Sequence, residues 1–161
     1  MSLIENNSPI QLDEIDNRIL KLLQAKSNLT TKELAVKVNL STTPVFERVK
    51  KLERAGYIKR YIAVLDAVKL NKGLMVFCNV TLKEHTRDIG NQFVKDILSL
   101  KQVVECYNIS GDYDFFLKIL VSDMKEYQNF VLDYLGNIKN IGSTHSTFVM
   151  GEIKNSYAVP I

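Results

Sequence analysis

The stretch LSTTPVFERVKKLERAGYI, residues 40–58, decides the fold of the first third of the chain. Pro44 fits only the first turn of a helix, and Gly56 suits the left-handed position that ends one. We therefore expect a helix over residues 42–55. The apolar residues that recur at helical spacing and predict its buried stripe are Val45, Val49 and Leu52.

Two shorter amphipathic helices precede this stretch. The apolar residues at helical spacing in the first are Leu12, Ile15, Ile19, Leu22 and Leu23. Asp13 can cap this helix, and Asp16 lies in its first turn, where negative charge is favoured. Thr30 and Glu33 form a capping box that opens the second helix. Its expected inward residues are Leu34, Ala35 and Val38. Residues 39–41 then break the pattern, which predicts a tight turn between the second and third helices.

The residues after the third helix predict a wing. Residues 57–65 are apolar, β-branched and free of helix or strand breakers, so we expect a strand or small hairpin there. Three helices followed by a short β element describe a winged helix-turn-helix. Residues 10–65 carry 11 Lys and Arg against 6 Asp and Glu, in a chain whose net charge is only +3. This excess of positive charge suits a polyanion, although a charge run alone fits a solvated face equally well.

In such a fold the third helix enters the major groove of double-stranded DNA. The short hydroxyl side chains at its start can bond to bases or phosphates, or simply cap the helix, and both uses are compatible. Val45 can meet a thymine methyl group, Arg48 can reach guanine or a phosphate, and the other basic residues suit the DNA backbone. For Phe46 we favour core packing over a thymine contact. The expected DNA-binding residues are Ser41, Thr42, Thr43, Val45, Arg48, Lys50, Lys51, Arg54, Lys59 and Arg60.

The pattern changes to strand alternation after residue 73. The first strand should bury Leu74, Val76, Cys78, Val80 and Leu82 on one face. A helix with an inner face of Ile89, Phe93, Val94, Ile97 and Leu98 follows. Strands over residues 102–109 and 115–121 come next, and then a helix marked by Met124, Tyr127, Val131, Tyr134 and Leu135. A last strand over residues 143–153 completes a β-α-β-β-α-β order, with both helices expected on one face of an antiparallel sheet.

Nothing in this second half predicts catalysis or metal binding. His85 and His145 are isolated from cysteines and carboxylates at ligand spacing, so we read each as solvated or hydrogen-bonded. No phosphate-binding glycine loop or nucleophile elbow is present, and we expect neither an enzyme nor a cofactor. Cys78 and Cys106 are better interpreted as reduced thiols than as a disulfide. With no membrane span and no signal peptide in residues 1–10, the cytoplasm is the expected location.

Three motifs, in this order, resemble the Lrp/AsnC family of transcription regulators. They are LDEIDNRIL at residues 12–20, the stretch at residues 40–58 quoted above, and SGDYD at residues 110–114. The resemblance implies a sequence-specific DNA-binding regulator whose C-terminal domain senses an amino acid or related metabolite. It also implies a homodimer that assembles further into an octamer.

The SGDYD segment is the best candidate for binding a small molecule, although Gly and Asp are equally usual in a hairpin turn. Gly111 lets a ligand approach the backbone, and Asp112 or Asp114 can pair with an ammonium group. The family resemblance puts the effector site between subunits, at this loop, the preceding strand and the last strand. By position its residues are Asn108, Gly111, Asp112, Asp114, Met124, Thr144, Ser146, Thr147 and Phe148.

Several of these assignments have simpler alternatives. The hydroxyl residues of the last strand suit a solvated sheet edge, and Met124 suits a helix core. Asn108 and Thr147 depart from the larger apolar residues of leucine sensors, which favours a bulkier or more polar effector.

The helix-free sheet face should bind another subunit, because Met75, Phe77, Phe116 and Leu120 alternate with the helix-covered residues. A C2 dimer would hold two recognition helices about 34 Å apart on a pseudo-palindromic operator. We thus predict an α+β chain with a winged helix-turn-helix at residues 1–65 and a linker at residues 66–73. Residues 74–161 form a ferredoxin-like, ACT-like βαββαβ domain for effector binding and oligomerisation. The alternatives are an architectural, chromatin-organising protein without a functional effector site and, by fold analogy alone, an enzyme.

Overall fold

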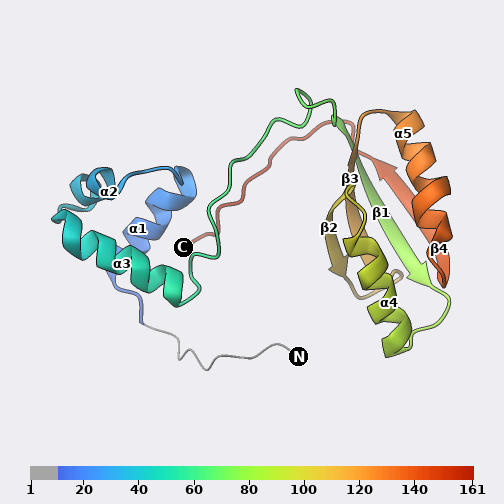
Figure 1. The fold of residues 1–161 in the computed structure, drawn as a ribbon, viewed down its shortest axis with the longest axis horizontal. Helices are drawn as coiled ribbons and strands as arrows, with labels where there is room; N and C mark the ends of the chain where they lie inside the picture. The colour runs from blue at the N-terminus through green and yellow to red at the C-terminus, as the bar shows by residue number, and fades with distance from the viewer. Residues whose placement is uncertain (1–10) are drawn as a thin grey trace. The chain divides into compact units, whose positions relative to one another are not determined.

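The computed structural model describes residues 11–161 and divides the chain into two compact units (Figure 1). One contains the chain up to Val64 together with Lys154–Ile161, and the other contains Leu65–Ile153. The first break falls one residue before the predicted end of the DNA-binding domain. Residues 1–10 of that predicted domain, on which the expectation of no signal peptide rests, lie outside the described residues.

Three helices build the first unit: α1 (Glu14–Ala25), α2 (Thr31–Val38) and α3 (Thr42–Arg54). The predicted capping box of Thr30 with Glu33 is present on α2. Asp13 caps α1 as predicted, and Asp16 completes a second capping box there that was not predicted. Gly56 has the expected left-handed φ of 75° after α3. The buried apolar residues, which come from all three helices, are Ile19, Leu20, Leu23, Leu34, Ala35, Val38, Val45 and Leu52.

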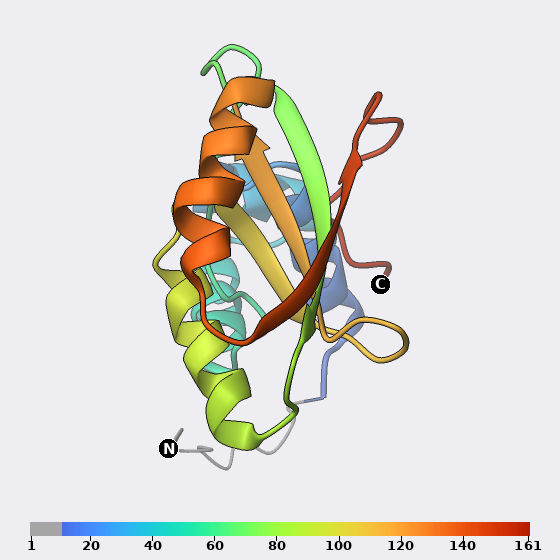
Figure 2. The same cartoon turned by 90° about the vertical axis from the view of Figure 1, so that its right-hand side faces the viewer.

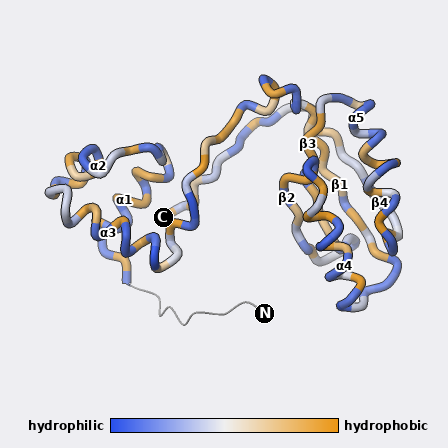
Figure 3. The backbone as a smooth tube through the Cα atoms, in the orientation of Figure 1, coloured by the Kyte–Doolittle hydropathy of each residue, from blue (hydrophilic) through white to orange (hydrophobic). Residues whose placement is uncertain are grey.

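The predicted wing does not form a strand or hairpin. Residues 57–65 are irregular, and Tyr61, Val64 and Leu65 are exposed although Figure 3 shows this segment as largely hydrophobic. The segment holds to α3 through the Tyr61 hydroxyl, which donates to Glu53 Oε1 at 3.0 Å. A strand needs a neighbouring strand for its backbone groups, and the described part of this unit contains no strand.

The last residues of the chain return to this first unit, which the sequence did not predict. The Gln24 side-chain amide pairs with the backbone of Val159 in both directions, donating to its carbonyl at 3.2 Å and accepting from its N–H. Lys154–Ile161 therefore belongs with the helices and not with the sheet domain assigned from the sequence.

The second unit has the predicted β-α-β-β-α-β order. Its elements are β1 (Leu74–Leu82), α4 (Arg87–Leu98), β2 (Val103–Asn108), β3 (Phe115–Val121), α5 (Met124–Asn129) and β4 (Ile141–Phe148). The four strands form one antiparallel sheet in the order β2-β3-β1-β4. Both helices cover the same face of this sheet, as Figure 2 shows. Under them lies the core, which includes Val76, Cys78, Val80, Phe93, Ile97, Leu117 and Ile119.

Three details of this unit differ from the prediction. The last strand ends at Phe148 and not at residue 153, because its pairing with β1 runs out there. On the helices Val94, Leu98, Met124 and Tyr134 are exposed, since Phe93, Ile97, Tyr127 and Leu135 already fill the inward positions. A π-helical turn (Phe130–Tyr134) and a 3-10 turn (Leu135–Asn137) continue α5 and alter its periodicity. They bury Phe130, which the sequence pattern missed.

The predicted linker, residues 66–73, packs as a turn on the second unit. Lys72 Nζ donates to both carboxylate oxygens of Glu126, at 2.6 and 2.8 Å. The backbone N–H of Ser122 donates to the same carboxylate at 2.6 Å. These bonds, Lys72 first, lower the pKa of Glu126 to about 2.

Candidate DNA interface and effector site

The start of α3 presents free hydroxyl groups. Ser41 is the N-cap residue, but its side chain makes no capping hydrogen bond, so simple capping is not its role here. Thr42 and Thr43 follow in the first turn and are also exposed. The positive end of a helix and three short hydroxyl side chains together suit an anionic or base-edge partner.

Val45 lies in the buried stripe as predicted, which excludes its predicted contact with DNA, and Phe46 differs from its prediction. Val45 is fully buried in the helical core, so it cannot meet a thymine methyl group. Phe46 is 47% exposed, so core packing is the wrong interpretation for it. Adjacent helix positions lie about 100° apart, and the core contact falls on Val45. Lys50 Nζ lies 5.8 Å from the centroid of the exposed Phe46 ring.

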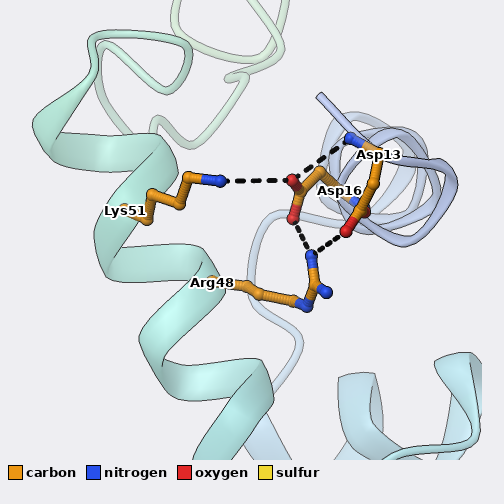
Figure 4. A network of polar contacts seen from close by, with 4 residues as sticks. All are labelled: Asp13, Asp16, Arg48 and Lys51. Carbon is orange, nitrogen blue, oxygen red and sulfur yellow. Dashed lines mark hydrogen bonds and ion pairs between the residues drawn. The ribbon is translucent and has the colours of Figure 1, made fainter. Parts of the chain in front are cut away.

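Arg48 is turned towards α1, as Figure 4 shows. Its Nη1 donates to Asp13 Oδ2 and to Asp16 Oδ1, both at 2.6 Å. The Asp16 side chain is only 1% exposed, and Lys51 Nζ lies 3.8 Å from its other oxygen. The bond from the Asp16 backbone and that from Arg48 lower the pKa of Asp13, while Asp16 and Asp13 raise the pKa of Arg48. The structure therefore places Arg48 in an internal ion pair and not on the outer face of α3.

The remaining basic residues lie on the surface. Lys50 pairs with Glu53 at 2.7 Å, and the Arg54 Nε donates to the Lys50 carbonyl at 3.3 Å. Lys59 and Arg60 are exposed in the irregular segment after α3. The exposed candidates for DNA contact are Ser41, Thr42, Thr43, Lys50, Lys51, Arg54, Lys59 and Arg60, to which the structure adds Phe46.

In the second unit, the SGDYD loop is held at the end of β1 through Asp114. Its carboxylate accepts from the Leu82 backbone N–H at 2.7 Å and lies 3.0 Å from His85 Nε2. Asn108 Nδ2 donates to the Asp114 carbonyl at 3.0 Å. Gly111 has a φ of 118°, a conformation that favours glycine. Asp114 thus already has internal partners, whereas Asp112 at the loop tip is exposed.

The strand β4 lies at the sheet edge and carries the other predicted effector residues. Ser146 is not free for a ligand, because its hydroxyl is hydrogen-bonded to the buried Tyr127 hydroxyl under the sheet. The Phe148 ring packs edge-on against Tyr127, with centroids 5.3 Å apart. Thr144 and Thr147 are exposed. Burial raises the pKa of Tyr127 and that of the neighbouring Cys78 thiol, so both stay neutral near pH 7.

The sheet register divides the predicted effector residues into two groups. Thr144 lies opposite Val80 of β1, at the end where Asp114 binds the strand. Phe148 lies opposite Val76, four residues and about 13 Å along the strand. Met124 follows β3 at that far end and is 57% exposed, so it is not a core residue. One chain therefore does not gather all these residues around one point.

Sequence reasoning missed several residues of these regions. One is Tyr113 of the loop, which stacks on His145 of β4 with ring centroids 6.4 Å apart. His85, by contrast, has the hydrogen-bonded role expected of it, with its Nε2 3.0 Å from an Asp114 carboxylate oxygen. The sequence assigned Asp13 only to the cap of α1 and Asp16 only to its first turn. Their spacing of three residues in a capping box, with free carboxylate oxygens, was the one available signal for their second role.

The described residues contain no cluster suited to a metal ion. Within the same residues, no helix has the length and hydropathy needed to cross a bilayer.

Comparison with known proteins matches both units. A family model described as winged helix-turn-helix DNA-binding covers residues 12–59, and one described as the Lrp/AsnC ligand binding domain covers residues 75–159. Leucine-responsive regulatory proteins of Klebsiella pneumoniae and Escherichia coli K12 are 38% identical over 145 residues, 90% of this chain and 88% of theirs.

Solved structures agree with these matches. A transcriptional regulator of Neisseria meningitidis, in complex with L-Met, has a TM-score of 0.89 and 33% identity, covering 93% of this chain and 97% of that one. An AsnC family regulator of Agrobacterium tumefaciens has a TM-score of 0.88 and 36% identity, covering 92% and 97%.

Proposed function

This chain belongs to the Lrp/AsnC family of DNA-binding transcription regulators, and on that premise we propose that it controls transcription in response to an amino acid. Its N-terminal unit is a helix-turn-helix and its C-terminal unit an amino-acid-binding domain of the family. Its relatives are regulators and not enzymes. We also propose that the protein is located in the cytoplasm and binds DNA there.

The observation that carries the DNA-binding part is the exposure of the outer face of α3. The first-turn hydroxyls, Phe46 and the basic side chains are exposed, while Val45 and Leu52 hold the helix to the core. We expect the hydroxyls and Phe46 to meet base edges, and Lys50, Arg54, Lys59 and Arg60 to meet phosphates. Neutralising phosphates gives affinity that falls with salt, and the base-edge contacts give sequence preference.

A homodimer, assembling further to an octamer, is the proposed functional form. The helix-free sheet face carries Met75, Phe77, Phe116 and Leu120, each only partly buried within the single chain. The Phe77 and Phe116 rings are 5.1 Å apart and form an apolar centre, beside the ion pair of Lys118 and Glu105 at 3.0 Å. A second copy covering this face would remove apolar surface from water and place two α3 helices on one operator.

The division of the predicted effector residues favours a site completed by another subunit. Asn108, Gly111, Asp112 and Thr144 would supply one part, and Met124, Thr147 and Phe148 of a neighbouring copy the other. The exposed Asp112 carboxylate suits the ammonium group of an amino acid better than Asp114, which is already bonded. Because the Neisseria meningitidis regulator is a complex with L-Met, methionine is the first effector to try.

The test is operator binding with and without each of the twenty amino acids. The operator is selected from a random DNA pool by the purified protein, and binding is followed by fluorescence anisotropy. We expect one amino acid or a small group to change the affinity 5–150-fold, a coupling of about 1–3 kcal/mol. Asp112→Asn should lose this response while retaining basal DNA binding, and Asp88→Asn on α4 is the matched control. Tight DNA binding without any response would favour the architectural function.

A further inference from the structure

The start of α1 and the middle of α3 are joined by a cluster of charges on the side of α3 that faces α1 (Figure 4). One guanidinium nitrogen of Arg48 donates to carboxylates of both Asp13 and Asp16 at 2.6 Å. The Asp16 side chain is 1% exposed and the Arg48 side chain 26% exposed. A buried carboxylate of this kind depends on its partner, because leaving it unpaired costs far more than the pair contributes.

The two carboxylates are themselves held in place before Arg48 reaches them. Asp13 Oδ1 accepts from the Asp16 backbone N–H at 2.7 Å, and the Asp13 N–H donates to Asp16 Oδ2 at 3.4 Å. This reciprocal capping box fixes both side chains at the N-terminus of α1. The oxygens that are not fully used by the cap are those that bind Arg48.

The contacts that hold α3 against α1 and α2 have an apolar part and a charged part. Val45 and Leu52 bury one face of the helix, but the hydrophobic effect is non-directional. Charge-assisted hydrogen bonds depend on direction and distance, so Arg48 can fix a rotation that the apolar side chains only approximate. A rotated α3 would present its hydroxyls and Phe46 at the wrong angle to a base edge.

We propose that the Asp13–Asp16–Arg48 cluster sets the orientation of the recognition helix, so that Asp16 and Arg48 are positioning residues for sequence-specific DNA binding. Neither residue then contacts DNA. This inference rests on the DNA-binding function proposed above and adds to it the residues that control its specificity.

Electrostatics alone predicts the opposite result for one substitution. Asp16 is a negative charge behind a helix that meets a polyanion, so removing it should strengthen binding to any DNA. The positioning role predicts that Asp16→Asn weakens binding to the preferred operator. A charge effect and a positioning effect therefore differ in sign.

The experiment compares two duplexes of equal length, the operator selected by the wild-type protein and a scrambled sequence. Affinities are measured by fluorescence anisotropy at several salt concentrations, at a temperature where circular dichroism shows each variant to be folded. For Asp16→Asn we expect a loss of about tenfold on the operator, similar to losing one good base contact, and no loss on the scrambled duplex. Glu14→Gln removes the same charge from the same helix turn, and it should leave the operator preference unchanged.

Further variants cover a failure of Asp16→Asn to fold. Asp13→Asn retains a good N-cap side chain but weakens the pairing with Arg48, and it should reduce the operator preference less. Arg48→Gln should reproduce the loss of preference without changing the dependence of log affinity on log salt. Arg48→Lys, which keeps the charge, should restore part of the preference.

Three results would overturn the inference. One is an operator affinity of Asp16→Asn equal to or above that of the wild type. Another is a drop of about 0.9 in the salt slope of Arg48→Gln, the mark of a lost phosphate contact. The third is an equal loss on both duplexes, which would indicate a purely structural role. If the wild-type protein binds neither duplex, the proposed function fails first and the inference falls with it.

Discussion

The two units of this chain differ in how complete their functional regions are within a single copy. In the helical unit, α3 has its inner face held by Val45, Leu52 and Arg48 and its outer face exposed. In the sheet unit, Asp114 and Ser146 are used for internal bonds, and the other predicted effector residues lie at two ends of the sheet. One chain thus presents the complete outer face of α3, whereas in the function proposed above the effector site draws on residues of a second copy.

The largest effect on this difference between the two units is expected when the chain is kept monomeric. Phe77→Asp places a charge in the apolar centre of the helix-free face, beside Phe116. We expect a monomer by light scattering and a loss of operator affinity on the order of a hundredfold, because the two heads no longer bind together. Leu98→Lys, on the exposed side of α4, is the control and should remain an oligomer. If the Phe77→Asp variant stays dimeric, the interface lies elsewhere.

A smaller effect is expected on the stability of the sheet unit, which should depend on pH through Glu126. Glu126 has a pKa of about 2, chiefly because of Lys72, whereas its ordinary value is 4.5. Its folded-state pKa is lowered, so it stabilises the fold above about pH 4.5, and this contribution is lost as pH falls towards 2. Lys72→Met should remove about 1 kcal/mol of stability at pH 7, a value reduced for solvent screening, and flatten the dependence between pH 2 and 4.5.

Urea unfolding at a series of pH values measures that change. Lys69→Met is the control, because it removes a more exposed and longer ion pair, Lys69 with Asp66 at 3.9 Å. It should leave the change in stability between pH 2 and 4.5 as it is in the wild type. If the free energy of unfolding of Lys72→Met fell as steeply between pH 4.5 and 2 as that of the wild type, Lys72 would not be the chief cause of the low pKa of Glu126.

The role of Ser146 can be tested through the Tyr127 hydroxyl, to which it is hydrogen-bonded. Tyr127→Phe should lower the free energy of unfolding by about 1 kcal/mol, the usual net value of one hydrogen bond. If the Ser146 hydroxyl serves only Tyr127, Ser146→Ala added to Tyr127→Phe should have little further effect in a double-mutant cycle of thermal unfolding. Additive losses would show that Ser146 has another partner.

The smallest expected effect concerns the basic residues after α3. Lys59→Ala should weaken binding to the operator and to scrambled DNA equally, by a few-fold, and reduce the salt slope by about 0.9. Anisotropy titrations over a range of salt concentrations provide the measurement. A selective loss on the operator would instead mean that Lys59 contributes to sequence preference.

Local patterns in the sequence predicted most of the fold. The Asp13 cap of α1, the Thr30–Glu33 capping box of α2, Gly56 after α3 and the alternation of β1 are set by residues close together in the chain, and the structure confirms them. The faces of residues such as Phe46 and Met124 were not predictable, because hydrophobicity at helical spacing does not say which residue the neighbouring elements cover. The strand or hairpin expected at residues 57–65 did not form, because a strand depends on a partner strand as well as on its own residues.

The candidate site was predictable to a smaller extent. The motif at residues 40–58 predicted the hydroxyl side chains at the start of α3 and the lysines on its surface. The internal role of Arg48 depends on carboxylates more than thirty residues earlier, and no local rule links them. The Tyr127–Ser146 bond likewise joins a helix to a strand that is distant in the sequence.

The most direct test of an effector site shared between subunits is a thermal-unfolding scan with each of the twenty amino acids, run on the wild-type protein and on Phe77→Asp. A ligand at a hundred times its Kd adds about 2.7 kcal/mol to a protein that binds it only when folded. We predict a selective rise in Tm for the wild type and none for the monomeric variant. An equal rise in both would show that one chain completes the site, which would contradict the account.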